Sequence, residues 1–87
     1  NCEAPDIAFV ANAATGLSTL IQGLAWEPGD EVLTLQGEFP NQLYLSAVLK
    51  RFGVTLRPVD WPRFYASVNE STRLVVLSTV NYATGWR

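Results

Sequence analysis

The strongest constraint on the fold is a regular alternation of apolar runs and helix-like segments along the chain of 87 residues. Four short runs are rich in strand-forming residues, and the segments between them carry helical spacing or helix-start signals. The four runs are residues 7–10, 32–35, 54–57 and 74–77. Because strand–helix–strand connections place the two strands in parallel, this order predicts a mostly parallel sheet with helices packed against it. The predicted fold class is α/β, a β-α-β-α-β-α-β segment of a three-layer sheet, with residues 74–77 as a central strand.

The predicted helices have recognisable ends. Asn12 is a favourable N-cap residue, and leucine and isoleucine then recur with helical spacing as far as Trp26. A second helix is predicted over about residues 40–52, with Gly53 as its C-terminal cap. A third, weaker helix is predicted over residues 61–68, with Trp61, Phe64, Tyr65 and Val68 on one face.

Composition excludes several classes of protein. Hydrophobic residues make up 48% and charged residues 16%, which is too apolar for a disordered chain. No apolar run approaches the length that a membrane-spanning helix needs, so we expect no membrane contact. The net charge is −2 and the six basic residues are scattered, which argues against nucleic acid as a partner.

Cysteine and histidine content narrows the chemistry further. The single cysteine, Cys2, cannot form an internal disulfide, which fits a reducing compartment and predicts a cytoplasmic location. The chain has no histidine, so it holds neither a histidine-based triad nor a histidine-containing zinc site, and we predict no metal. The chain starts at Asn1, lacks methionine and ends just after a polar loop, so we expect it to be a fragment of a longer protein.

Three polar or glycine-containing segments follow the predicted strands, at the sheet edge where α/β proteins bind ligands. Residues 11–16 lead into a helix, where small side chains let an anion approach the backbone and Thr15 adds a hydroxyl donor; an ordinary capped helix start has the same pattern. Residues 36–41 contain Phe39, either a core residue or a platform for a planar ligand. Residues 78–85 carry several hydrogen-bonding side chains, as a plain polar loop also does.

Lys50 is the only lysine in the chain. It shares one side of the second predicted helix with Gln42 and Ser46, whereas leucine and alanine occupy the other faces. We therefore predict an exposed lysine rather than a buried nucleophile, and no Schiff-base lysine within this chain.

Four segments together resemble one family, the class V aminotransferase-like enzymes of fold-type I, which use pyridoxal phosphate. Residues 9–17 (FVANAATGL) resemble the helix start that cradles the cofactor phosphate, and residues 24–33 (LAWEPGDEVL) are similar to the stretch that follows it. Residues 37–44 (GEFPNQLY) resemble the segment with the ring-stacking residue. Residues 72–85 (TRLVVLSTVNYATG) resemble the strand and loop beside the cofactor.

The resemblance implies a role for five residues in cofactor binding. The backbone of Ala14, and the backbone and hydroxyl of Thr15, would hold the phosphate, and Phe39 would stack on the pyridine ring. Tyr82 and Thr84 would lie near the cofactor.

The chain also departs from the family at several of these positions. Many relatives have a second threonine where Ala14 stands, so one donor is missing. Cysteine desulfurases and selenocysteine lyases usually have histidine at position 39 and desulfurases asparagine at position 82, whereas phenylalanine and tyrosine are more like kynureninase. Residues 40–42 (PNQ) do not follow the kynureninase pattern.

By this resemblance, residues 1–87 are part of the large, cofactor-binding domain of an enzyme that acts on a small amino acid through an aldimine. Desulfurase, selenocysteine lyase, kynureninase and isopenicillin N epimerase-like branches remain open, so the reaction is that of a lyase, epimerase or transaminase. The family's aspartate and aldimine lysine lie later in the chain, so these residues include no catalytic residue and should be inactive alone. The parent protein would be a homodimer. The alternatives are a non-catalytic α/β module that binds another phosphate ligand, and a degenerate enzyme homologue.

Overall fold

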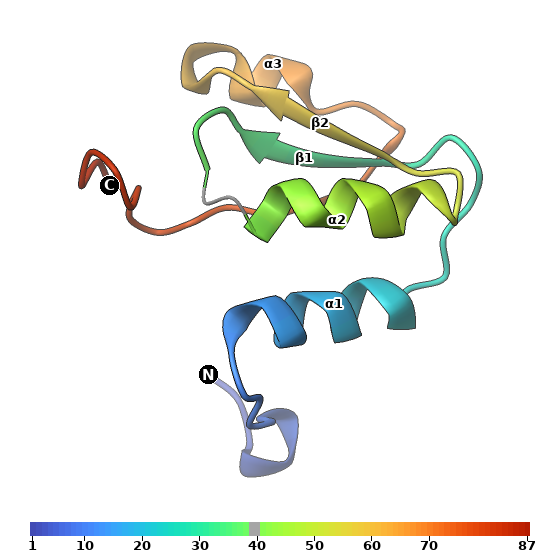
Figure 1. The fold of residues 1–87 in the computed structure, drawn as a ribbon, viewed down its shortest axis with the longest axis vertical. Coiled ribbons are helices and arrows are strands. Elements are labelled where there is room, and N and C mark those ends of the chain that lie inside the picture. The colour runs from blue at the N-terminus through green and yellow to red at the C-terminus, as the bar shows by residue number, and fades with distance from the viewer. Residues whose placement is uncertain (39–40) are drawn as a thin grey trace.

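The computed structural model describes residues 1–38 and 41–87, which form an open three-stranded sheet with helices on its faces (Figure 1). Among these residues, no helix is long and apolar enough to cross a membrane. The elements in chain order are η1 (Ala4–Asp6), α1 (Ala13–Gly23), β1 (Glu31–Leu35), α2 (Asn41–Lys50), β2 (Thr55–Val59), η2 (Trp61–Arg63), α3 (Phe64–Ser67) and β3 (Thr72–Val75).

The sheet is entirely parallel, with the strand order β2-β1-β3. This confirms the predicted α/β class with alternating strands and helices. The central strand is β1, because its middle residues Val32, Leu33 and Thr34 are all buried. The prediction that residues 74–77 form a central strand is wrong: β3 ends at Val75 and lies at the edge of the sheet.

The main core lies between one face of the sheet and the helices α1 and α2. Residues from both helices and all three strand regions contribute to it, and α1 contacts α2. The buried members are Ile21, Val32, Leu45, Leu49, Val54 and Val76. Sequence periodicity anticipates part of these contacts: Leu17 and Ile21 of the predicted apolar spacing pack in the core, whereas Leu20 of the same spacing is exposed.

The two predicted helix ends that were most specific are confirmed. Asn12 caps α1, because its side-chain Oδ1 accepts a hydrogen bond from the backbone N–H of Thr15 at 2.8 Å. The turn after α2 ends at Gly53, whose φ of 71° is strained for any residue with a side chain. A methyl group at Gly53 would also lie 3.4 Å from the Cα of Pro28.

The opposite face of the sheet is covered differently from the prediction. Residues 61–68 do not form one helix but a 3-10 turn, η2, followed by the single turn α3. Of the predicted aromatic face, only Phe64 is buried, whereas Trp61 and Tyr65 are exposed. Pro62 stands in the first turn of this connection, which crosses from β2 over β1 to β3.

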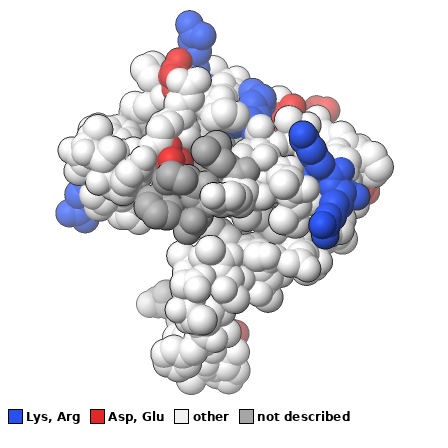
Figure 2. All heavy atoms as spheres, viewed as in Figure 1, with Lys and Arg blue, Asp and Glu red and all other residues white. Residues whose placement is uncertain are grey.

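The predicted strand at residues 7–10 is not formed. Its apolar side chains are exposed, with Phe9 100% accessible, and the segment projects from the body of the molecule (Figures 1 and 2). A strand needs a neighbour that accepts and donates its backbone hydrogen bonds, and none of the described strands lies beside this segment. Strand propensity alone therefore overstated the number of strands.

An indole hydrogen bond closes the C-terminal end of α1 and provides a test of this core. Trp26 Nε1 donates to the carbonyl oxygen of Ile21 at 2.6 Å, satisfying a group that has no partner within the helix. We expect Trp26→Phe, which keeps an apolar ring and removes the donor, to lower the free energy of unfolding by about 1–2 kcal/mol. Urea unfolding measures this, with Tyr44→Phe on the exposed side of α2 as the control that should remain unchanged. Equal effects of the two substitutions would contradict the structural role of the indole.

Candidate functional site

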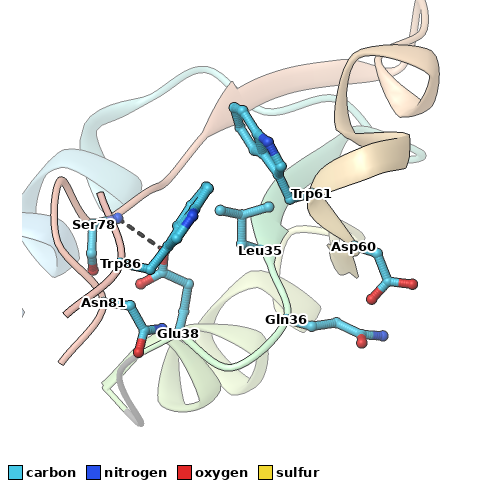
Figure 3. A pocket seen from close by; sticks show the side chains of 8 residues that line it. All are labelled: Leu35, Gln36, Glu38, Asp60, Trp61, Ser78, Asn81 and Trp86. Atoms are coloured by element: carbon cyan, nitrogen blue, oxygen red, sulfur yellow. Dashed lines mark hydrogen bonds between the residues drawn. The ribbon is translucent and has the colours of Figure 1, made fainter. Parts of the chain in front are cut away.

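A cavity of about 290 Å³ opens at the carboxyl ends of the strands (Figure 3). Its walls come from the last residue of β1 and from the segments that follow each of the three strands. The lining residues are Leu35, Gln36, Glu38, Asp60, Trp61, Ser78, Asn81 and Trp86. A cavity at this edge of a parallel sheet is where α/β proteins usually bind their ligands.

Two tryptophans form the apolar part of the cavity. Trp61 follows β2, and Trp86 comes from the last loop; their ring centroids lie 5.2 Å apart in an edge-to-face arrangement. Both rings converge over Leu35, the last residue of β1 (Figure 3). Trp61 also stacks on the buried Phe64, which fixes the position of its ring. The cavity thus presents two indole surfaces, each about half exposed, above an aliphatic floor.

Asn81 connects the loops that surround the cavity. Its Nδ2 donates to the carbonyl oxygen of Gly37 at 3.0 Å, across 44 positions in the sequence. Its Oδ1 accepts from the backbone N–H groups of Ala83 and Thr84 and from the hydroxyl of Thr84. The backbone N–H of Asn81 donates to the carbonyl oxygen of Trp86. One side chain therefore shapes the last loop and attaches it to the loop after β1.

The charged groups at the cavity are acidic. Glu38 Oε1 accepts a hydrogen bond from the backbone N–H of Ser78 at 3.0 Å, which holds this carboxylate beside Trp86 (Figure 3). Asp60 lies on the other side of Leu35. No lysine or arginine is among the described residues that line the cavity. The described residues also include no group of three or more acidic, cysteine or histidine side chains that could hold a metal ion.

The residues predicted to hold a phosphate lie elsewhere. Ala14 and Thr15 are exposed in the first turn of α1 and do not line the cavity. The N-terminal end of α1 is on the same side of the molecule as the arrowheads of β1 and β2 (Figure 1). The N–H of Thr15 already donates to Asn12. This helix end therefore lies on the side of the carboxyl ends of the strands, and a capping residue already occupies one of its donors.

The remaining predicted cofactor residues differ in position. The hydroxyl of Thr84 donates to Oδ1 of Asn81 and accepts from the backbone N–H of Trp86. Thr84 therefore contacts two residues that line the cavity but does not line it itself. Tyr82 is exposed and does not line the cavity. Phe39 lies outside the described residues.

Lys50 is exposed at the last residue of α2. Because α2 runs antiparallel to the strands, its C-terminal end lies at the amino edge of the sheet, away from the cavity (Figure 1). This agrees with the predicted exposed lysine. It also means that the chain's one lysine cannot reach the loops at the carboxyl edge.

Sequence reasoning missed the two tryptophans and both carboxylates of the cavity. The sequence predicts Trp61 on a helix face and gives Trp86 no role in a site. Glu38, Asp60 and Trp61 all come within three residues of a strand end, which is the signal that could have identified them. Trp86 carries no such signal, because only the fold of the last loop brings it against Trp61.

Comparison with known proteins finds two curated relatives from Schizosaccharomyces pombe. One, an uncharacterized aminotransferase, is 29% identical over 87 residues, which cover 91% of this chain and 22% of the relative. The other, an uncharacterized protein, is 30% identical over 87 residues, covering 91% of this chain and 20% of the relative. No known protein family matches the chain, and no solved structure matches it.

The chain spans about a fifth of the length of these two relatives. The match to the aminotransferase covers 91% of this chain. The chain is therefore similar to one segment of a protein named as an aminotransferase.

Proposed function

We propose that this chain is part of the large, cofactor-binding domain of a pyridoxal-phosphate enzyme of the class V aminotransferase type, which acts on an amino acid. The observation that carries the proposal is the similarity to the S. pombe aminotransferase over 91% of the chain. Enzymes that transfer amino groups use this cofactor as an electron sink. The parallel sheet, with its ligand cavity at the carboxyl edge, is consistent with this role.

The N-terminal end of α1 fits the phosphate of such a cofactor. It is the start of an 11-residue helix with small, exposed residues, so its first N–H groups can approach an anion. The hydroxyl of Thr15 adds a donor in the same turn. Asn12 would compete for the N–H of Thr15, because its Oδ1 accepts from that group.

The cofactor, when bound, would delocalise negative charge that develops on the substrate. This chain's residues would bind and orient it: Thr15 at the phosphate, and Asn81 and Thr84 by fixing the loop beside the cavity. Lys50 is too far from this edge to react with a cofactor there. The reactive lysine therefore belongs to the remainder of the parent enzyme, which we propose to be a homodimer.

An absorption spectrum of the full-length protein tests the proposal. We expect a yellow protein whose visible band is lost on borohydride reduction, with the reduced cofactor attached to a lysine other than Lys50. A colourless protein that stays colourless when pyridoxal phosphate is added would contradict the enzyme proposal. Binding of inorganic phosphate alone at α1 would then favour a non-catalytic phosphate-binding module.

A pair of threonine variants tests the phosphate position. We expect Thr15→Ala to weaken pyridoxal phosphate binding about tenfold, because a hydrogen bond to a charged group is lost. Thr19→Ala removes a hydroxyl of the same helix, one turn further on, where it donates to the carbonyl of Thr15. This control should change the dissociation constant less than about twofold. Equal effects of both variants would place the phosphate elsewhere.

A further inference from the structure

We propose that the cavity between Trp61 and Trp86 binds a small organic cation, an alkylated ammonium group. Three observations point to this ligand: two indole rings line the same cavity, a carboxylate is fixed beside them, and no basic residue is among the described residues that line it. The proposal does not depend on pyridoxal phosphate, because the phosphate position at α1 lies outside this cavity.

The aromatic walls suit a cation. A cation within about 6 Å of a tryptophan ring centroid is attracted to the negative face of the ring, and tryptophan gives the strongest such interaction. Trp61 and Trp86 contact each other edge to face, with centroids 5.2 Å apart, and both line the cavity, so a ligand that lies against the pair can contact both indoles. The rings are 45% and 48% exposed, which leaves surface for a ligand to cover.

The charges select a cation over an anion. Glu38 is held toward the cavity by its hydrogen bond to the N–H of Ser78, and Asp60 lines the other side. An anionic group here would be repelled by both carboxylates, with no lysine or arginine of the lining to offset them. Leu35 and the two indoles favour alkyl substituents on the nitrogen, and a volume of about 290 Å³ limits the ligand to a small molecule.

Choline and its uncharged isostere, in which carbon replaces the nitrogen, have the same shape and differ in charge. Comparing their binding therefore tests whether the cavity recognises the positive charge. We would titrate both into the isotope-labelled, full-length protein without pyridoxal phosphate and follow the indole N–H signals, assigned by substitution. We expect choline to shift the signals of Trp61 and Trp86 saturably and the isostere to leave them in place. Trp26 is an internal control, because its indole N–H donates to Ile21 within the core.

Charge-neutral variants test the carboxylate. Glu38→Gln keeps an oxygen that can accept from Ser78 and removes the charge, so we expect the dissociation constant for choline to rise about threefold to tenfold. Asp60→Asn gives a second variant, since Asp60 makes no side-chain cap to η2. Glu70→Gln removes the same charge from an exposed turn outside the cavity and should change the constant less than twofold.

A tryptophan variant tests the aromatic wall. We expect Trp86→Leu to weaken choline binding about threefold to tenfold, and Tyr44→Leu, an exposed aromatic on α2, to leave it unchanged. Equal shifts with choline and its isostere, or equal constants for the cavity variants and their controls, would overturn the proposal. An absence of any shift at Trp61 and Trp86 would overturn it as well. A failed choline titration of a protein that turns yellow when pyridoxal phosphate is added afterwards would reject the cation site and leave the cofactor proposal intact.

Discussion

Replacing Leu49 by alanine is expected to lower the free energy of unfolding by about 2–5 kcal/mol. Leu49 is fully buried on α2, in the core that joins both long helices to the sheet. Its carbonyl oxygen also accepts from the N–H groups of Phe52 and Val54 at the turn into β2. The truncation would leave a cavity beneath the strands, because neighbours anchored to a sheet relax only partly. A loss of this size is a large part of the total stability of a small domain.

Urea unfolding of the full-length protein measures the loss. Leu20→Ala is the matched control, because it removes the same atoms from a helix residue that is 49% exposed. We expect this control to cost less than about 1 kcal/mol. If both substitutions cost the same, α2 would not pack on the sheet as the structure places it.

The parts of the fold that local chemistry determines could be predicted from the sequence. Asn12 needs only its own chain neighbours to cap α1, and Gly53 needs only its positive φ to end the turn after α2. The strand β1 follows from four apolar or β-branched residues before Gly37. Each of these signals acts within one or two turns of the chain, so no tertiary contact had to be known.

The parts of the fold that depend on residues distant in the sequence could not be predicted. Residues 7–10 have the composition of a strand, yet a strand forms only beside another edge, and here they remain exposed. Which strand is central is likewise a matter of order in space: β1 takes that place because β2 and β3 pair on either side of it. Residues 74–77 are as apolar as β1, and Leu77 is 43% exposed at the sheet's edge.

For the candidate site, too, the location could be predicted from the sequence but most of the lining residues could not. The rule that ligands bind at the carboxyl ends of parallel strands located the correct edge, and the last predicted segment does line the cavity through Ser78 and Asn81. The two tryptophans that line the cavity could not be predicted from the sequence, because Trp61 and Trp86 are 25 positions apart and meet only in the folded chain. Aromatic residues after a strand are usually core, so composition alone gave no reason to expect two exposed indoles.

Asn81→Ala is expected to open the last loop without unfolding the sheet. The substitution removes three acceptor contacts within residues 81–84 and the bond to Gly37. We expect hydrogen exchange at the backbone N–H groups of Ala83 and Thr84 to accelerate about 10-fold to 100-fold, since each 1.4 kcal/mol of lost local stability is a factor of ten. The global free energy of unfolding should fall by less, because the loop contributes no residue to the main core.

Asn81→Asp separates the two tasks of this side chain. It keeps the oxygen that accepts from Ala83 and Thr84 and removes the Nδ2 donor to the carbonyl of Gly37. We expect the loop amides to stay protected in this variant, while the indole signals of Trp61 and Trp86 move, because the loop is released from the end of β1. Protection lost equally in both variants would mean that the bond to Gly37 alone orders the loop. Since Trp86 accepts from the N–H of Asn81 through its carbonyl, the same loop that shapes the polar side of the cavity also positions its indole wall.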